Sequence, residues 1–421
     1  MTLFLDGSDD LDLARWIRPG DGLIWGQACA EPVTLTAALT QQAAGLGPLT
    51  AFVGTTYADA FDPAAAPNVR VLAYGASGRN RRWQADGLQE ALPVQYSALA
   101  GLFRRRIIPV DVILVTVAPP DADGRYALGL AEEYLSAALD VARVVIAEVS
   151  PNVPRIHGAR TLAADDIDVL VRTDRSPVEL VAPEPGPTDR ALARQVATVV
   201  PDGAVLQVGI GSFPGAVLAE LGEHNDLGIH SGLFADGMVD LVERGVVTNR
   251  TKLRDRGMSV AGVVMGSSRL FGWLHDNPAV ALRDTAYTHG IEVLGAIPRF
   301  TAVNTAIEVD LTGQVNGEVA GGRYVGAIGG ALDFLRGAAR SDGGVPIIAL
   351  PSAVRGRSTI VESLSGPVTV GRADVGIVVT EHGAADLRGL GPAERRERLL
   401  AIASPDHPLS PGTGREEKER T

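Results

Sequence analysis

One short pattern occurs twice in this chain, and this repeat constrains the fold most. In each half a turn leads into an apolar strand, then a loop with a proline, then apolar residues at helical spacing; these stretches start at Pro19 and Pro201. A later apolar strand runs into a proline-containing loop in each half, at 144–150 and 346–352. Apolar strands that alternate with helical stretches are typical of parallel β/α units. The sequence therefore predicts an α/β protein with two similar domains in tandem and mostly parallel sheets.

Residues 182–188 are rich in proline and have the composition of a linker. We therefore expect one domain over 1–185 and a second over 186–408. Residues 409–421 are polar and charged with no apolar pattern, which predicts a mobile tail. Ligand sites in α/β folds favour the ends of strands and the interfaces of domains, so we expect an interdomain cleft.

Composition restricts the function classes. Among 421 residues, 46% are hydrophobic and 21% are charged, which describes a globular protein rather than a disordered one. A net charge of −12 argues against nucleic acid and anionic membranes as partners. The single cysteine, Cys29, cannot form an intramolecular disulfide or a thiolate metal cluster, and we expect no metal. We expect Cys29 to be a packed thiol rather than a nucleophile.

The same sequence features suggest a setting. The first 14 residues carry four aspartates and no basic segment, unlike a signal peptide, and no apolar stretch is long enough to span a membrane. Basic residues are nearly all arginine, and lysine occurs only at Lys252 and Lys418. These features predict a cytoplasmic protein from a bacterium with a GC-rich genome.

A glycine-rich turn carries the first functional signal. An apolar run over 205–208 is followed by Gly209-Ile210-Gly211-Ser212-Phe213 and then by helically spaced apolar residues. Glycines let a backbone pass close to a ligand, and free N–H groups at a helix start suit an anion or an oxyanion. Alone the pattern also fits a packing turn, since the dinucleotide-binding fingerprint is not completed here.

Longer motifs follow this turn in a fixed order. They are Asp226–His230, Phe234–Leu241, Val264–Ser267, Val303–Asn316, Gly329–Phe334 and Val379–Gly389. In the first half they are preceded by Cys29–Pro32, Pro119–Asp121 with Gly124, and Pro151–Arg155. With these motifs the chain resembles the acetyl-CoA hydrolase/transferase family, the class I CoA-transferases that include 4-hydroxybutyrate and succinyl-CoA:acetate transferases. The resemblance extends from about residue 15 to about residue 408.

The resemblance implies a CoA-transferase-type fold, an acyl-CoA and an acceptor as substrates, and a homodimer. It implies that coenzyme A is bound by the turn from Gly209 to Phe213 and by a loop containing Gly329 and Gly330. In the family that loop approaches the CoA and offers backbone N–H groups to the reacting carbonyl.

The resemblance also implies a nucleophile that this chain lacks. In the family, the segment aligned with 230–237 contains a glutamate that attacks the thioester and forms first an acyl-glutamyl anhydride and then a glutamyl-CoA thioester. Covalent acyl exchange needs a group that is both nucleophile and leaving group. Gly232 stands at this position and can serve as neither.

Other residues are candidates for the catalytic role, which stays unassigned. Ser231 is adjacent to the glutamate position, but neighbouring strand residues face opposite sides, so we expect it to point away. His230 could act as a general base, although a structural role is expected for it. Glu308 is expected to be a hydrogen-bonded structural carboxylate. Glu318 is also expected to be a structural carboxylate. Asp236 is expected to cap a helix that begins near Met238. His382 has no assigned role.

These expectations leave three functions open. The first is an enzyme that acts on an acyl-CoA thioester without the glutamyl-CoA step, with water or a bound nucleophile attacking in space vacated at Gly232. The second is an acyltransferase to an amine or alcohol, and the third is a CoA-binding protein without turnover. Arginine clusters at 79–82 and 104–106 are candidates for anion contacts or are solvated surface charges. The acyl group is not identified by the sequence.

Overall fold

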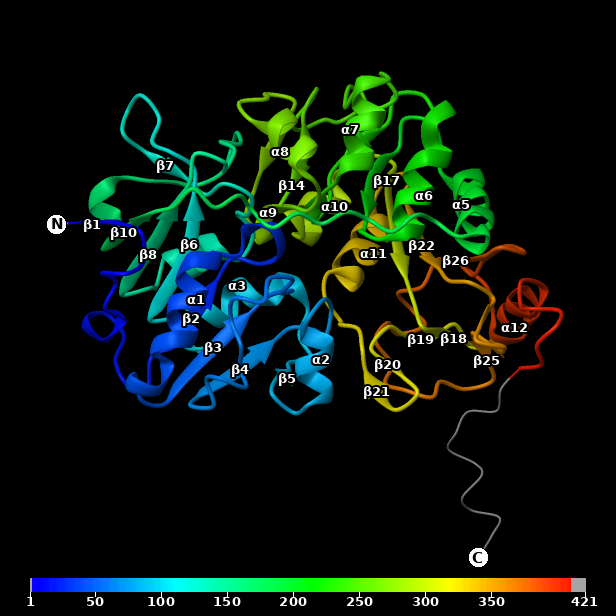
Figure 1. The fold of residues 1–421 in the computed structure, drawn as a ribbon. Coiled ribbons are helices and arrows are strands. Elements are labelled where there is room, and N and C mark those ends of the chain that lie inside the picture. The colour runs from blue at the N-terminus through cyan, green and yellow to red at the C-terminus, as the bar shows by residue number, and fades with distance from the viewer. Residues whose placement is uncertain (1, 410–421) are drawn as a thin grey trace, which may run out of the picture. The chain divides into compact units, whose positions relative to one another are not determined.

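The computed structural model describes residues 2–409, so the predicted tail lies outside the described residues except for Leu409. The chain forms two compact units (Figure 1). The first contains the chain up to Val181 with Leu233–Asp236 and Val260–Thr288, and the second contains Ala182–Gly232, Gly237–Ser259 and the chain from His289 onward.

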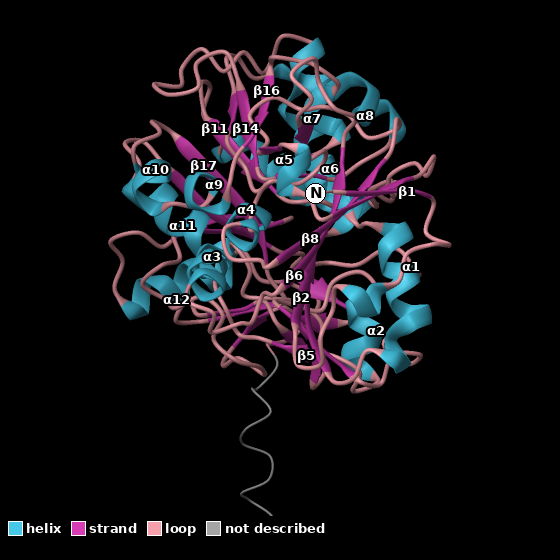
Figure 2. Cartoon of the chain, turned by 90° about the vertical axis from the view of Figure 1, so that its left-hand side faces the viewer, coloured by secondary structure: helices cyan, strands magenta, loops and turns pink. Residues whose placement is uncertain are grey.

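The first unit is built on an eight-stranded sheet in which every pairing is parallel. Its central strand β6 is buried at all six positions, which explains why the strand is apolar throughout. Figure 2 shows β2, β6 and β8 side by side in this sheet. In spatial order the strands are β1 (Leu3–Asp6), β10 (Val169–Arg172), β8 (Val144–Val149), β6 (Val112–Val117), β2 (Gly22–Trp25), β3 (Leu49–Val53), β4 (Val69–Ala73) and β5 (Glu90–Ala91). The helices between them are α1 (Val33–Gln42), α2 (Asn80–Ala85), α3 (Tyr96–Arg104) and α4 (Leu135–Leu139).

Two later segments of the chain belong to this first unit. The short strand β13 (Leu233–Phe234) pairs in parallel with β15 (Val263–Val264), and single bridges join Ala131 to Val263 and His157 to Ala281. The other elements here are β7 (Tyr126–Ala127), β9 (Thr161–Leu162), β14 (Ser259–Ala261), β16 (Val280–Leu282), α8 (Ser268–Leu274) and α9 (Thr285–Thr288). The two compact units are therefore not continuous stretches of the chain, because backbone pairing returns these segments to the first unit, and the division expected at 185/186 stays a prediction.

The second unit contains a six-stranded sheet that is parallel except between its last two strands. In order the strands are β12 (Gly228–Ile229), β11 (Val205–Val208), β17 (Phe300–Thr305), β22 (Val345–Ala349), β26 (Ile377–Thr380) and β27 (Gly383–Asp386). The helices are α5 (Pro187–Val199), α6 (Ser212–Glu220), α7 (Asp236–Glu243), α10 (Ile291–Gly295), α11 (Ala331–Arg340) and α12 (Pro392–Ala401). Short pairings are made by β18 (Glu308–Asp310), β19 (Val315–Asn316), β20 (Val319–Ala320), β21 (Arg323–Tyr324), β23 (Ala353–Val354), β24 (Arg357–Ser358) and β25 (Ile360–Val361).

The predicted α/β class with mostly parallel sheets is confirmed. Both repeat copies form the expected elements, since β2 precedes α1 and β11 precedes α6. The expected linker ends where α5 begins, at Pro187, and the Asp189 carboxylate accepts a hydrogen bond from the Gly186 N–H there. A proline in the first turn and an acidic side chain that bonds the cap are both typical helix starts.

Candidate functional site

The glycine turn connects β11 to α6, as the sequence predicts. Gly211 has φ 127° and ψ −176°, a backbone conformation that L side chains rarely adopt, so glycine is needed there. An added Cβ at Gly209 or Gly211 would meet only Pro214, at 3.9 and 3.8 Å. No side chain caps α6, and the turn is partly exposed. Backbone N–H groups at the start of α6 therefore have space beside them for a ligand.

The second predicted loop leads into α11. Gly329 has φ 54°, and Gly330, at the helix cap, accepts a hydrogen bond from the Phe334 N–H at 3.1 Å. Phe334 on α11 belongs to a core cluster that also holds Phe300 of β17 and Val205 of β11. The loop is thus held by a helix that packs on the central strands of this unit.

Gly232 follows β12, and the space beside it is filled. A Cβ built on Gly232 would lie 3.3 Å from both Cε1 and Nε2 of His289 and 3.4 Å from Cζ of Phe334. A Cβ built on Gly330 would lie only 2.7 Å from Nε2 and 2.8 Å from Cδ2 of the same imidazole. The tip of the His289 ring therefore lies between two glycines that are about a hundred residues apart in the chain. The sequence led us to expect vacated space at Gly232. The structure corrects this expectation, because the rings of His289 and Phe334 lie there.

His289 reaches this place because it precedes Gly290, the N-cap residue of α10, and α10 packs against α11. Its ring centroid lies 4.5 Å from that of Phe334, with the planes tilted by 41°. Sequence reasoning missed His289, since it lies in a three-residue stretch, Thr288-His289-Gly290, that carries no motif. Its proximity to Gly232 is visible only after folding.

Burial controls the protonation of this histidine. Loss of solvation, with a smaller contribution from the nearby His230, lowers the pKa of His289 from 6.5 to about 3. The imidazole is therefore neutral at physiological pH. His230 is also buried, and its ring lies edge-to-face on Phe300 at 6.3 Å.

The other catalytic candidates are held in structural bonds. Ser231 is fully buried, and its Oγ donates to the Val208 carbonyl at 3.2 Å. The Glu308 carboxylate accepts from Asn316 Nδ2 at 2.9 Å and from the N–H and Oγ of Ser365 at 2.6 and 2.9 Å. These contacts are those of residues that maintain the fold.

Three further residues considered in the sequence, Glu318, Asp236 and His382, also have defined surroundings in the structure. Glu318 accepts from Tyr324 Oη at 2.9 Å and from Thr369 Oγ1 at 2.7 Å. The Asp236 carboxylate accepts from the Ser267 N–H at 3.0 Å, and α7 begins at Asp236 itself rather than near Met238. His382 is more than a third exposed and stands beside Glu381.

Cys29 is buried in the first unit, and burial raises the pKa of its thiol to about 12. A thiol with such a pKa is almost wholly protonated at neutral pH, whereas the thiolate is the nucleophile. Its placement agrees with a packed thiol.

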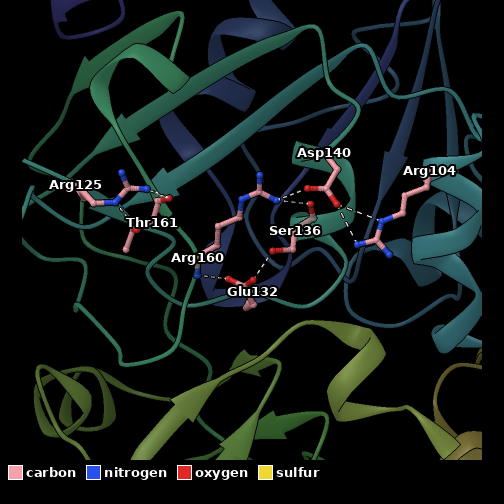
Figure 3. Close-up of polar contacts among 7 residues, drawn as sticks. All are labelled: Arg104, Arg125, Glu132, Ser136, Asp140, Arg160 and Thr161. Atoms are coloured by element: carbon pink, nitrogen blue, oxygen red, sulfur yellow. Dashed lines mark hydrogen bonds and ion pairs between the residues drawn. The ribbon is translucent and has the colours of Figure 1, made fainter.

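Several arginines considered for anion binding are paired within the protein. Figure 3 shows Arg104, whose guanidinium donates to Asp140 at 3.1 and 3.2 Å, and Arg160, which donates to the same carboxylate at 2.6 Å and to the Ser136 carbonyl at 2.9 Å. Arg82 pairs with Asp86 one helical turn further on. These partly exposed pairs are typical surface contacts that contribute little to stability.

Two negative findings concern residues 2–409 alone. Within them, no group of three or more histidine, cysteine or acidic side chains is arranged to hold a metal ion. None of the helices in this range is both long and apolar enough to cross a bilayer.

Comparison with known protein families shows which family this chain belongs to. The N-terminal domain model of acetyl-CoA hydrolase/transferase matches residues 9–182, and the corresponding C-terminal domain model matches 266–409. The chain belongs to the acetyl-CoA hydrolase/transferase family. The predicted resemblance is confirmed, and the chain is assigned to this class of enzymes, whose members bear the names of CoA transferases and acetyl-CoA hydrolases.

Individual relatives agree with this assignment. The 4-hydroxybutyrate coenzyme A transferase of Clostridium kluyveri is 36% identical over 324 residues, which is 76% of each chain. The succinyl-CoA:cyclohexane-1-carboxylate CoA transferase of Geobacter metallireducens is 32% identical and covers 94% of this chain and 92% of its own. Among solved structures, RipA from Yersinia pestis superposes with a TM-score of 0.87 at 33% identity, covering 94% of this chain and 93% of RipA.

Proposed function

We propose that the protein cleaves an acyl-CoA thioester by direct attack of water and forms no glutamyl-CoA intermediate. The observation that carries this proposal is the surroundings of position 232. The resemblance to the family implies that Gly232 stands where the family has its glutamate, and the atoms nearest to the Cβ position of Gly232 belong to the imidazole of His289 and the ring of Phe334. An imidazole and a phenyl ring cannot form the acyl anhydride that the transfer reaction requires.

Binding of the acyl-CoA is proposed at the two glycine loops. The turn from Gly209 to Phe213 has room around its backbone, and Gly330 lies beside the His289 tip. Backbone donors aimed at a developing oxyanion lower a barrier by roughly 3 to 4 kcal/mol for a single donor. This stabilisation operates whether the attacking group is a carboxylate or water. The relatives are named for acyl-CoA substrates such as butyryl-CoA and succinyl-CoA, which supports an acyl-CoA here.

The cost of losing the nucleophile sets the expected rate. Removing the nucleophile of a covalent mechanism lowers the turnover number by roughly a million-fold, while binding and the oxyanion donors leave a residual acceleration of about 10³ to 10⁴ over water. We therefore expect slow hydrolysis rather than rapid exchange. We also propose a homodimer, which the family resemblance implies, in the cytoplasm of a bacterium, whose GC-rich genome the arginine bias indicates.

The experiment incubates the protein with acetyl-CoA, butyryl-CoA and succinyl-CoA, with and without acetate, and follows free thiol and newly formed acetyl-CoA. Borohydride treatment, which destroys a glutamyl-CoA thioester, is applied in parallel. We expect thiol release that does not depend on acetate and is insensitive to borohydride. Acetate exchange abolished by borohydride would refute the proposal, because another carboxylate would then be the nucleophile. Tight CoA binding without release would identify a binding protein.

A further inference from the structure

A hollow of about 340 Å³ lies beside the start of β4, at the end of the large sheet where β4 and β5 are neighbours (Figure 1). Its lining comes from the loop before β4, from β4 itself and from the turn before β5, and includes Pro63, Pro67, Val69, Leu88 and Gln89. All of these residues belong to the first unit. The volume is at the small end of the range for ligand pockets, which suits a short segment of chain.

The backbone of β4 directs hydrogen-bonding groups toward this hollow. Alternate residues of a strand direct their N–H and C=O groups to opposite neighbours. The first N–H of β3 donates to the Asn68 carbonyl at 2.9 Å, so Asn68 faces β3 and the next residue, Val69, faces outward. Val71 and Ala73 face outward for the same reason, and the Leu92 N–H after β5 donates to the Ala73 carbonyl at 2.7 Å.

The chain that would cover this outer edge turns away from it. β5 pairs with β4 only at the last two residues of β4. In the same register Leu88 would lie beside Arg70, but its N–H donates to the Trp83 carbonyl of α2 at 2.8 Å. Among residues 2–409, the Val69 carbonyl and the Val71 N–H therefore have no ladder partner, and both residues line the hollow.

The side chains of the lining indicate the polarity of a ligand. Gln89 is 6% exposed, and its Nε2 donates to the Gly75 carbonyl at 3.0 Å, whereas its Oε1 has no hydrogen-bond partner in the part of the chain that the structure describes. A buried acceptor without a donor is unfavourable, so a ligand N–H would be stabilising there. Arg70 and Glu90, the charged residues of the lining, pair with each other. The hollow therefore suits an uncharged ligand with N–H groups.

We propose that this hollow binds an extended, uncharged peptide segment of a partner protein, which adds to the outer edge of β4 in line with β5. One residue of the segment takes the place that Leu88 leaves: its N–H donates to the Val69 carbonyl, and its own carbonyl accepts from the Val71 N–H. Another N–H of the segment donates to Gln89 Oε1, and an apolar side chain packs on Pro63. Addition of a strand to an exposed sheet edge is a common mode of peptide recognition. The site is independent of the thioester reaction.

The test titrates the full chain with the acetylated and amidated tripeptide alanyl-valyl-alanine, followed by amide NMR and calorimetry. A second probe carries an N-methyl group on the valine nitrogen, which removes the donor to the Val69 carbonyl. Ala64→Trp places a large side chain in the hollow, because Ala64 is exposed and belongs to the lining. Ala65→Trp is the matched control, since Ala65 is the next residue, is also exposed and lies outside the lining.

The Val71 N–H is the direct reporter of strand addition. Without probe it should exchange with solvent faster than the N–H groups of Arg70 and Leu72, which face β3. The tripeptide should shift the Val71 amide resonance and slow this exchange. The N-methylated probe should bind about tenfold more weakly, because it lacks one hydrogen bond. Ala64→Trp should abolish the shift, and Ala65→Trp should leave it as in the parent.

Each contrary result has a defined meaning. Equal binding of the two probes, or no shift at Val71, overturns strand addition. Loss of binding in both tryptophan variants overturns the hollow as the site. Protection of Val71 that grows with protein concentration without probe identifies a second copy as the occupant, and tighter probe binding by a chain ending at Leu409 identifies the chain's own last residues; either result overturns a partner protein. Circular dichroism establishes that the variants are folded; should Ala64→Trp not fold, the comparison of the two probes decides.

Discussion

Replacing Gly330 by alanine tests the packing on which the site depends. The backbone of Gly330, at φ −90° and ψ −2°, is open to alanine, so no backbone strain is expected. The added Cβ would lie 2.7 Å from Nε2 of His289, whereas ordinary contacts begin at 3.4 Å. The ring must therefore move by about 0.7 Å, and Phe334, whose Cε2 lies 3.0 Å from the same Cβ position and whose ring packs on His289, restricts this movement.

Overpacking of this kind lowers the free energy of unfolding by roughly 1 to 3 kcal/mol. The assay is chemical denaturation followed by circular dichroism, with stability read from the midpoint. Gly215→Ala is the control, because Gly215 lies inside α6 and an added Cβ meets nothing within 4 Å. That change should stabilise the protein by about 0.5 to 1 kcal/mol, since alanine suits a helix better than glycine.

A double-mutant cycle identifies the partner. When His289→Ala is already present, Gly330→Ala should have little effect, because the atoms that it would overlap are gone. A coupling energy of about 0.5 to 3 kcal/mol is expected for residues in contact. If Gly330→Ala leaves stability unchanged in the parent, or if the two effects add without coupling, the imidazole does not lie where the structure places it, and the reasoning about the site fails.

Three more predictions follow from the same structure. Gly232→Glu alone should not gain borohydride-sensitive acetate exchange, because the new side chain starts 3.3 Å from the imidazole, whereas Gly232→Glu combined with His289→Ala should gain it; exchange by the single variant would contradict the packing. The Cys29 thiol, with its pKa raised to about 12 by burial, should react with Ellman's reagent at pH 8 only after unfolding, and rapid reaction in the native state would place it at the surface. Burial also raises the pKa of Glu133 from 4.5 to about 7, so the folded state prefers the protonated acid, and its stabilising contribution is present below pH 4.5 and lost as the pH rises through 7. Glu133→Gln should flatten this decline in the denaturation midpoint between pH 5 and 7, and an unchanged slope would show that the carboxyl is ionised in the folded state throughout.

Much of the fold could be predicted because its signals are local. The apolar run at Val205–Val208, the turn at Gly211 and the helix that follows are neighbours in the chain, and side-chain spacing alone predicts such elements. The family could be inferred for a related reason, since its motifs are continuous segments. The grouping of Val260–Thr288 with the first unit could not be predicted from the sequence, because it depends on strand pairing between distant segments.

For the candidate site too, some features follow from the sequence and others only from the tertiary structure. The sequence by itself determined that the glycine loops are present, and through the family resemblance it predicts that Gly232 stands at the position of the family's glutamate. It could not determine what fills the position beside Gly232, because a missing side chain leaves a space whose occupant depends on the packing of other elements. The tertiary structure decided this point: α10 packs on α11, and His289 is thereby placed between Gly232 and Gly330. Close packing of the core is the physical reason, since any residue that lacks a side chain in a packed interior is contacted by a neighbour from elsewhere in the chain.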